Sequence, residues 1–549
     1  MPNRRSPLVL VLCAGILFAE DPDPMSAEAL IETVKALSSV APPGTVDSNG
    51  AYGWTVKGGR GPRSGGYDAA RWIAARFGKA GLQPAPGRES FLVPFDVEVR
   101  WLQPDGGLSY VPAYGDPEPA QLRKDWLPLC FSAPGDVRAR VVFVGYGITA
   151  PEWKYDDYAE VDVRGKVVLA LAHEPREDQD GDAFEGKKLS RHGTEAEKAA
   201  NAQRHGATAL VIVADTKHAD DEPLESDATA WPGVVPPKDR ERIDSDMGRA
   251  MHLDEWTWAA GRQARHARLR AELKIPCAMA RRSWIERVLP RGALDLAEAQ
   301  AGIDSDLAPR SRELRERLGV AVDFRVERLP SANVVARVPG QVDEAIVVGA
   351  HYDHFDPIGR TVFPGACDNA SGTAVLLGVA EALAASKPRR TVYFVAFGGE
   401  ELGLQGSRAF AADPPVPLGE LAAMVNLDMA GRGEEGELTL LGVVRNPELA
   451  QVARDANAEV GFTLAENIEF AWPHGSDHFA FHEAGVPSLM LTSSRFGEYH
   501  TAKDTADQVS GPKMAKVASL LSAFIERLAA GEGRFPAPKE VDVPFPSRK

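Results

Sequence analysis

Short apolar runs alternate with longer amphipathic stretches through the second half of the chain. The runs have the length and β-branched content of buried strands, and the stretches between them have helical spacing. The expected strands are residues 333–338, 345–350, 391–397, 424–427, 438–441 and 488–491, and the clearest helices are residues 370–386 and 512–530. This alternation predicts an α/β sandwich in which helices cover both faces of a central sheet.

The first half of the chain is less regular and becomes strand-rich from about Arg140 onward. Strands are expected at residues 91–101, 141–144, 167–171 and 209–214, and helices at residues 26–37, 67–80, 256–273 and 284–318. Thr194 and Glu197 form a capping box that opens one more helix. The polar stretch 215–240 reads as a surface excursion.

The first residues have the pattern of a secretory leader. Arg4 and Arg5 precede an apolar run from Leu8 to Phe18, which is about half the ~20 residues that a membrane span needs. We therefore expect residues 1–19 to be a signal peptide and the mature protein to be secreted or periplasmic; a buried N-terminal helix is the alternative. Lipid anchoring through Cys13 is disfavoured, because too few apolar residues precede it. A second long apolar stretch is missing from the sequence, so stable membrane association is not expected once the leader is removed.

Composition excludes several classes of protein. The 549 residues predict about three folding units, and 62 basic against 78 acidic residues give a net charge of −16. An acidic chain argues against a nucleic-acid partner. The four cysteines show no metal-knuckle spacing, and a disulfide between Cys130 and Cys277 is left open.

Histidine and acidic residues lie at or near five expected strand ends. They are His351, Asp368, the pair Glu400 and Glu401, Asp428 and His500. Each is a weak signal alone, because an acidic residue at a strand end is usually a turn cap. Burying them together would be costly without a compensating cation, and mixed imidazole and carboxylate ligands suit zinc, with cobalt or manganese as substitutes. Two histidines and three carboxylates exceed what one open zinc site needs, so two metals sharing a carboxylate are expected.

Six motifs in this region resemble the M28 family of zinc metallopeptidases. They are GAHYDHFD, GACDNASGTAVLLGVAEAL, VAFGGEELGLQGS, VNLDMAG, SDHFAFHEAGVPS and YHTAKDT, and the match extends over residues 333–530. The stretch VVFVGYGITAPEWKYDDYAEVDVRGKVVLAL is similar to the protease-associated (PA) domain that many of these enzymes carry as an insertion. The resemblance implies a three-layer sandwich with a mixed, mainly parallel sheet, together with a β-rich α+β PA domain. It divides the chain into an N-terminal segment (20–135) packing with the catalytic domain, the PA domain (136–285), a helical connector (286–330), the catalytic domain (331–530) and a Pro-rich tail (531–549).

The resemblance also implies a role for each site residue. His351 and Asp428 would hold one zinc ion, Glu401 and His500 the other, and Asp368 would bridge the two. Asp353 would orient His351, Glu400 would be the general base, and Tyr499 would help to polarise the scissile carbonyl. Cys367 stands where relatives usually carry Asp or Asn, so a small packed residue is expected there and a thiolate ligand is the less favoured alternative.

These roles predict a secreted di-zinc exopeptidase that removes N-terminal amino acids from peptides. An M28-type carboxypeptidase or dipeptidase is the nearest alternative, and the carboxypeptidase would need a cationic group such as Arg432 or Arg495. A glutaminyl cyclase and an inert binding protein on a peptidase scaffold are further alternatives. The side-chain preference, the role of the PA domain and the oligomeric state are left open by the sequence.

The remaining histidines near the motifs have simpler interpretations. His354 is expected to line the cleft or to pack. His474, His478 and His482 have the spacing of one helix face, but no HExxH pattern accompanies them and a separate metal site is not expected.

Overall fold

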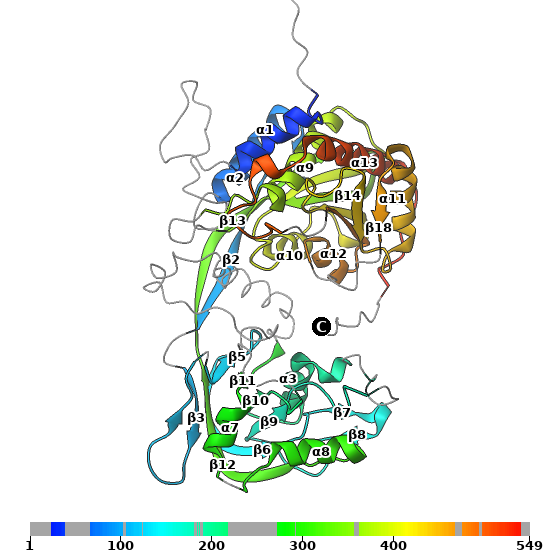
Figure 1. The fold of residues 1–549 in the computed structure, drawn as a ribbon. Helices are drawn as coiled ribbons and strands as arrows, with labels where there is room; N and C mark the ends of the chain where they lie inside the picture. The colour runs from blue at the N-terminus through cyan, green and yellow to red at the C-terminus, as the bar shows by residue number, and fades with distance from the viewer. Residues whose placement is uncertain are drawn as a thin grey trace, which may run out of the picture.

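The computed structural model describes two bodies joined by a long two-stranded ribbon (Figure 1). It describes residues 23–38, 66–102, 106–122, 124–179, 184, 186, 190–217, 272–290, 292–355, 362–466, 475–493 and 497–539. The expected leader, nearly all of the polar excursion and nearly all of the helix at 256–273 lie outside the described residues.

The C-terminal body is built on a nine-stranded sheet. Its order is β1 (Gln83–Pro84), β13 (Phe324–Val338), β15 (Arg390–Phe397), β14 (Val342–His351), β16 (Leu421–Leu427), β19 (Ser488–Thr492), β17 (Glu437–Leu441) and β18 (Thr463–Ala465), with β2 (Leu92–Leu102) also paired to β13. The central strands β15, β14, β16 and β19 are parallel to one another. Towards the edges, β13 and β17 pair with their inner neighbours in antiparallel fashion.

Both faces of this sheet are buried. Along β14, Ile346 and Val348 join the larger hydrophobic cluster, whereas Ala345 and Val347 join a smaller cluster on the opposite face. The larger cluster is completed by α1 (Ala27–Ser38), α2 (Gly66–Lys79), α9 (Gly372–Leu383), α11 (Pro447–Val460) and α13 (Gly511–Ala530). The smaller cluster is completed by α10 (Gln405–Ala412) and α12 (His478–Glu483). The expected three-layer α/β sandwich with a mixed sheet is confirmed.

The second body contains an eight-stranded mixed sheet. Its order is β4 (Glu118–Pro119), β3 (Gly107–Val111), β12 (Arg312–Val322), β6 (Gly135–Phe143), β9 (Val167–Leu171), β10 (Ala209–Val213), β11 (Cys277–Ala280) and β5 (Trp126–Pro128). Helix α3 (Glu195–Arg204) begins at the expected cap, where the Thr194 hydroxyl accepts a hydrogen bond from the backbone N–H of Glu197. Helices α7 (Arg282–Val288) and α8 (Leu296–Asp306) also pack against this sheet.

The expected helical connector is only partly helical. Helices α7 and α8 end by Asp306, and residues 312–338 form β12 and then β13 instead of continuing the helix. The sequence RELRERLGVAV is rich in helix formers, but its apolar residues alternate, and β12 pairs with both β3 and β6. Strand pairing in the folded chain therefore overrides the local helix preference.

The expected N-terminal segment is divided between the two bodies. Helices α1 and α2 pack into the C-terminal body, whereas Leu108 and the Trp126–Phe131 stretch belong to the hydrophobic cluster of the second body. A single role was expected for residues 20–135, because no composition change marks the point at which the chain crosses from one body to the other.

The ribbon that joins the bodies is formed by β2 and β13. Their antiparallel pairing runs from Leu102 opposite Phe324 to Leu92 opposite Val334. Its β13 strand follows β12 with only Asp323 between them, so the second body is continuous with the ribbon (Figure 1).

Two further expectations concern the cysteines and the membrane. The thiols of Cys130 and Cys277 are both buried and are not joined in a disulfide. Among the described helices, none combines the length and apolar character that crossing a membrane requires.

Candidate active site

The five side chains expected to be metal ligands lie together at one edge of the nine-stranded sheet. His351 is the last residue of β14, Asp428 directly follows β16, and Glu401 follows β15 after a short glycine turn. Asp368 lies in the irregular turn before α9, and His500 lies in the loop after β19. Because β14, β15, β16 and β19 are parallel, their carboxyl ends face the same side.

Asp368 lies between two pairs of side chains. Its Oδ1 is 3.4 Å from His351 Nε2, and its Oδ2 is 3.0 Å from His500 Nε2. His351 Nε2 is in turn 3.3 Å from Asp428 Oδ1, and His500 Nε2 is 3.5 Å from Glu401 Oε2. One carboxylate therefore presents one oxygen to each pair, which is the arrangement of a bridging ligand.

The separations between these atoms suit zinc. Ligand atoms about 2.0–2.1 Å from a tetrahedral zinc ion lie roughly 3.3 Å from one another. The four distances range from 3.0 to 3.5 Å. Two sets of three donors, one with His351, Asp368 and Glu401 and one with His351, Glu400 and Asp428, have their ligand atoms within 4.8 Å of one another. The donor set and its spacing therefore fit divalent ions of the zinc class.

The charge of the cluster also favours bound cations. Burial raises the pKa of Glu400, Glu401 and Asp428, and neighbouring carboxylates raise it further, against the opposing effect of His351. For Asp368, burial raises the pKa, but hydrogen bonds with His351 and His500 outweigh it and hold the pKa well below its usual range. The cluster thus concentrates more buried negative charge than its histidines balance, a condition that bound cations relieve.

Asp353 has a different set of partners from the one expected. His351 Nδ1 lies 3.2 Å from the main-chain carbonyl of Asp353 and 3.8 Å from its carboxylate. The carboxylate instead accepts hydrogen bonds from the backbone N–H groups of Glu400 at 3.1 Å and Glu401 at 3.3 Å. Asp353 therefore fixes the loop that carries both glutamates, and its main chain orients the imidazole.

His354 contacts the site more directly than the sequence indicated. Its Nδ1 is 2.6 Å from Glu401 Oε1, while the other Glu401 oxygen faces His500. His354 is buried and stacks on Phe355, with ring centroids 4.2 Å apart. The second histidine of the HYDH stretch was the available signal, but a loop histidine can equally well only pack.

Asp504 is a second residue that the sequence reasoning missed. Its buried carboxylate accepts hydrogen bonds from the backbone N–H groups of Cys367 and Asp368, at 2.9 to 3.1 Å. The loop that carries Asp368 is thereby held by a residue 136 positions away. Cys367 itself is buried, and burial raises the pKa of its thiol well above the usual range, so it fits the expected small packed residue.

Tyr499 lies over His500, with ring centroids 3.6 Å apart. Burial, together with the charges of Asp368 and Glu401, raises the pKa of its phenol well above the usual value. The phenol is therefore protonated and able to donate a hydrogen bond at neutral pH.

The other polar candidates are engaged elsewhere. Arg432 donates to the Glu498 carboxylate and, at 2.9 Å, to the Gln508 side chain. His482 Nε2 lies 3.0 Å from Arg445. Neither His478 nor His482 is part of a metal-type group among the described residues. Arg495 and His474 lie outside the described residues.

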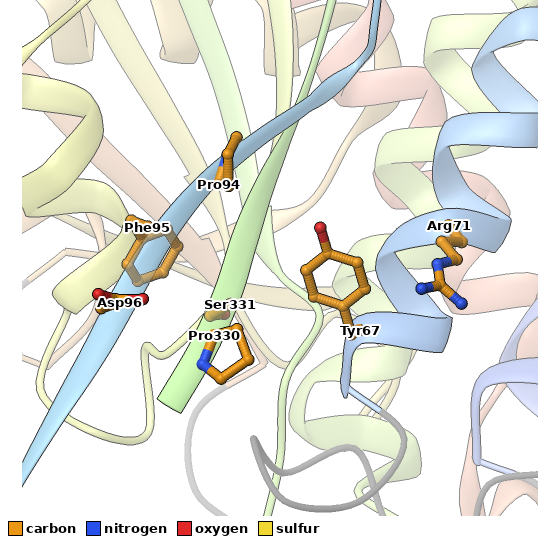
Figure 2. A pocket seen from close by; sticks show the side chains of 7 residues that line it. All are labelled: Tyr67, Arg71, Pro94, Phe95, Asp96, Pro330 and Ser331. Carbon is orange, nitrogen blue, oxygen red and sulfur yellow. The ribbon is translucent and has the colours of Figure 1, made fainter. Parts of the chain in front are cut away.

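A separate cavity of about 570 Å³ lies where the β2–β13 ribbon meets the C-terminal body (Figure 2). It is lined by Tyr67, Arg71, Pro94, Phe95, Asp96, Pro330 and Ser331. Its lining lacks the converging imidazole and carboxylate groups of the sheet-edge cluster, which remains the candidate active site.

Family models identify both bodies. Residues 333–525 match the model of peptidase family M28, and residues 137–239 match the model of the PA domain. Residues 333–525 are therefore similar to M28 peptidases and residues 137–239 to the PA domain, and these regions are called the M28 domain and the PA domain below. The resemblance seen in the sequence motifs is thus confirmed.

Individual relatives of the M28 domain are named as aminopeptidases. The chain is 29% identical over 229 residues to a "Probable leucine aminopeptidase" of Trichophyton verrucosum, a match that covers 38% of this chain and 59% of the relative. It is 32% identical over 219 residues to "Leucine aminopeptidase 1" of Grosmannia clavigera, covering 36% of this chain and 53% of the relative. The chain therefore spans a little over half the length of these curated relatives.

A solved structure supports the fold over nearly the whole chain. The aminopeptidase from Aneurinibacillus sp. strain AM-1 aligns with a TM-score of 0.52 and 21% sequence identity, covering 95% of this chain and 98% of that one. At this identity the likeness establishes the architecture of the M28 and PA domains, and the chemistry must be argued from the site.

Proposed function

We propose that this protein is an exported aminopeptidase that uses two zinc ions to remove N-terminal residues from peptides. The observation that carries the proposal is the Asp368 carboxylate, whose two oxygens face the His351–Asp428 pair and the His500–Glu401 pair. Export is supported by the basic and apolar pattern of residues 1–19. The aminopeptidase names of the relatives favour this activity within the M28 family.

Each metal would have its own pair of ligands. His351 and Asp428 would hold one ion, Glu401 and His500 the other, and Asp368 would contact both. When bound, the two ions would supply Lewis acidity and lower the pKa of water at the site. His354 and Asp504 would orient Glu401 and the Asp368 loop, as groups behind metal ligands generally do.

Glu400 would be the group that moves the proton. Its carboxylate lies 3.9 Å from His351 Nε2, at the rim of the cluster, and its backbone is fixed by Asp353. It would accept a proton from the attacking water and return that proton to the leaving amine. The protonated phenol of Tyr499 would donate a hydrogen bond to the carbonyl oxygen as negative charge develops on it.

The aminopeptidase names of the relatives favour a substrate with a free α-amino group. With both zinc ions bound the negative charge of the cluster is balanced, and a neutral α-amino group would bind one of the metal ions. A carboxypeptidase would need a cation in the cleft. Arg432, one of the two candidates, is bound to Glu498 and Gln508.

The test compares substrates and metals in one experiment. The purified protein is assayed with leucyl-nitroanilide and with an N-acetylated dipeptide, before and after treatment with a chelator, and its zinc content is measured. We expect at least two zinc ions per chain and chelator-sensitive hydrolysis of the nitroanilide alone. Hydrolysis of only the blocked dipeptide would instead identify a carboxypeptidase, and one zinc ion per chain would contradict the two-metal site.

Glu400→Gln tests the proposed base. The variant should keep both zinc ions and lose about 10²- to 10⁴-fold in kcat, the usual contribution of a general base. Glu448→Gln, the same change in the first turn of α11, is the matched control and should leave kcat unchanged. Full turnover by a zinc-loaded Glu400→Gln protein would remove Glu400 from its proposed role.

A further inference from the structure

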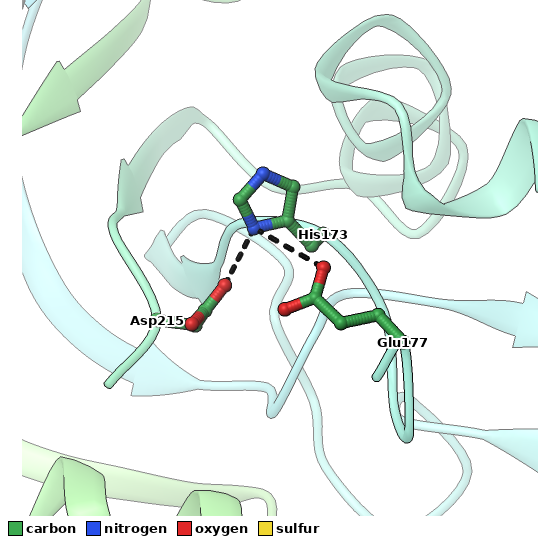
Figure 3. Close-up of side chains that lie close together, drawn as sticks. All are labelled: His173, Glu177 and Asp215. Atoms are coloured by element: carbon green, nitrogen blue, oxygen red, sulfur yellow. Dashed lines mark hydrogen bonds and ion pairs between the residues drawn. The ribbon is translucent and has the colours of Figure 1, made fainter. Parts of the chain in front are cut away.

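The PA body contains a second group of metal-type side chains, far from the M28 motifs in sequence. His173 lies two residues after β9, and Asp215 lies two residues after β10. These strands are parallel neighbours, with Leu171 opposite Val213 at their ends. Both side chains therefore emerge at the same edge of the sheet, and Glu177 reaches them from the loop that follows β9 (Figure 3).

One imidazole nitrogen faces both carboxylates. His173 Nδ1 lies 2.5 Å from Asp215 Oδ2 and 3.6 Å from Glu177 Oε2. The three ligand atoms lie within 4.8 Å of one another. Figure 3 shows the two carboxylates directed at the same side of the ring.

The surrounding groups hold this arrangement in place. The other Asp215 oxygen accepts a hydrogen bond from the backbone N–H of Lys217 at 2.8 Å, which directs Oδ2 towards His173. The carbonyl oxygen of His173 accepts a hydrogen bond from Lys198 Nζ at 2.6 Å, and the carbonyl oxygen of Asp215 accepts one from Arg282.

The positively charged side chains near this group bind other partners than the donor atoms that face His173 Nδ1. Lys198 and Arg282 bind the main-chain carbonyls named above. Lys217 Nζ pairs with Asp178 and Asp304, each at 2.8 Å. Groups that orient a donor without replacing it are the usual outer contacts of a metal site.

The group is enclosed but accessible. The Asp215 side chain is 0% exposed, whereas the side chains of His173 and Glu177 are 29% and 17% exposed. An ion could therefore enter from the His173 side, and water could complete its coordination.

We propose that His173, Glu177 and Asp215 form a third divalent-metal site, located in the PA domain and specific for ions of the zinc class. One imidazole and two carboxylates are a donor set that suits zinc, cobalt or manganese better than calcium, which prefers oxygen ligands alone. Three protein ligands leave at least one position for water or a partner group.

A proton would compete with the metal ion for the position between His173 and Asp215. Burial lowers the pKa of His173, but the hydrogen bond to Asp215 and the charges of Glu177 and Glu195 outweigh it and raise that pKa. In the metal-free chain, the imidazole and Asp215 share a hydrogen bond. Metal binding would replace the shared proton and open the 2.5 Å separation towards the roughly 3.3 Å expected between zinc ligands.

The experiment isolates the PA site by disabling the M28 site in the full-length chain. In a His351→Ala, Asp368→Ala, His500→Ala background, which removes donors from both metal-ligating sets of the M28 site, the metal-free protein is titrated with Co²⁺ and Zn²⁺ alone. The readouts are calorimetry, visible absorption and metal content after gel filtration. We expect one ion per chain to bind at micromolar concentration or tighter, with a cobalt spectrum that carries an imidazole ligand.

Variants then assign the ion. Glu177→Gln and Asp215→Asn should each weaken binding at least tenfold, and His173→Ala should abolish it. Asp178→Asn is the matched control, since it makes the same charge change at the exposed neighbour of Lys217 and should leave binding unchanged. Circular dichroism and thermal unfolding verify folding, and the partly exposed Glu177 provides the variant least expected to disturb it.

Two results would overturn the proposal. The first is a disabled-background protein that binds no ion, which would make the group an imidazolium ion pair. The second is an ion whose affinity is unchanged by Glu177→Gln and Asp215→Asn. Both results come from metal binding to the PA domain in a chain whose M28 site is disabled, so they are independent of the aminopeptidase proposal.

Discussion

Gln405 connects the ribbon to the loop that carries Glu400 and Glu401. Its Nε2 donates to the carbonyl oxygen of Glu98 in β2 at 3.0 Å and to that of Leu402 at 2.9 Å. Its Oε1 accepts a hydrogen bond from the Glu98 backbone N–H at 2.8 Å. The side chain therefore joins the glutamate loop to the strand that leads to the PA domain.

Gln405→Ala removes all three of these hydrogen bonds. At about 1 kcal/mol net for each bond, with water replacing part of the loss at a half-buried site, the free energy of unfolding should fall by about 2 kcal/mol. If the looser Glu400 loop also raises the activation free energy of the reaction by about 1.4 kcal/mol, kcat should fall roughly tenfold. KM should change little, because Gln405 contacts none of the proposed metal ligands.

The assay combines steady-state kinetics with denaturant unfolding followed by tryptophan fluorescence. Gln451→Ala, on the exposed face of α11, removes two surface hydrogen bonds and serves as the control for the substitution itself. A Gln405→Ala protein that loses stability but keeps wild-type kcat would refute the coupling between ribbon and loop. A protein that keeps both would show that the three contacts do not form in solution.

Three further outcomes are expected from the site and its surroundings. Asp504→Asn leaves the backbone N–H groups of Cys367 and Asp368 with a poorer acceptor, so zinc affinity, measured by chelator competition, should fall about 10- to 100-fold; unchanged affinity would contradict this role. Tyr499→Phe removes a protonated donor and should lower kcat about 10²-fold at similar KM, whereas equal kcat would exclude the phenol from the reaction. Burial and the charge of Arg445 lower the pKa of His482 from 6.5 to about 4, so its contribution to stability is complete above pH 6.5 and is lost as the pH falls towards 4. His482→Gln should reduce the slope of unfolding free energy against pH in that window, and an identical slope would show that another group controls it.

The fold of the M28 domain could be predicted from the sequence because its signals are local. The central strands are short apolar runs that are buried on both faces, and α9 and α13 have strong helical patterns. The convergence of the proposed ligands was also predictable, since parallel strands bring His351, Glu401 and Asp428 to one edge.

The errors arose where distant contacts decide the structure. Residues 312–322 have helix-forming composition but pair as β12 between two strands, one of which comes from residues 107–111. Asp504 resembles any loop acid in the sequence, and only the fold places it beneath Asp368. His354 and the PA group of His173 depend in the same way on side-chain directions that no spacing rule supplies.

The ribbon has a consequence for the evolution and engineering of this protein. The chain leaves the M28 domain along β2 and returns along β13, so its outgoing and returning residues face each other in register, as Leu102 and Phe324 do. A tight two-residue turn placed across such a pair would close the two strands into a hairpin and delete everything beyond it. The PA domain is thus attached like an exchangeable module, and other domains could be grafted at the same junction without cutting the M28 sheet.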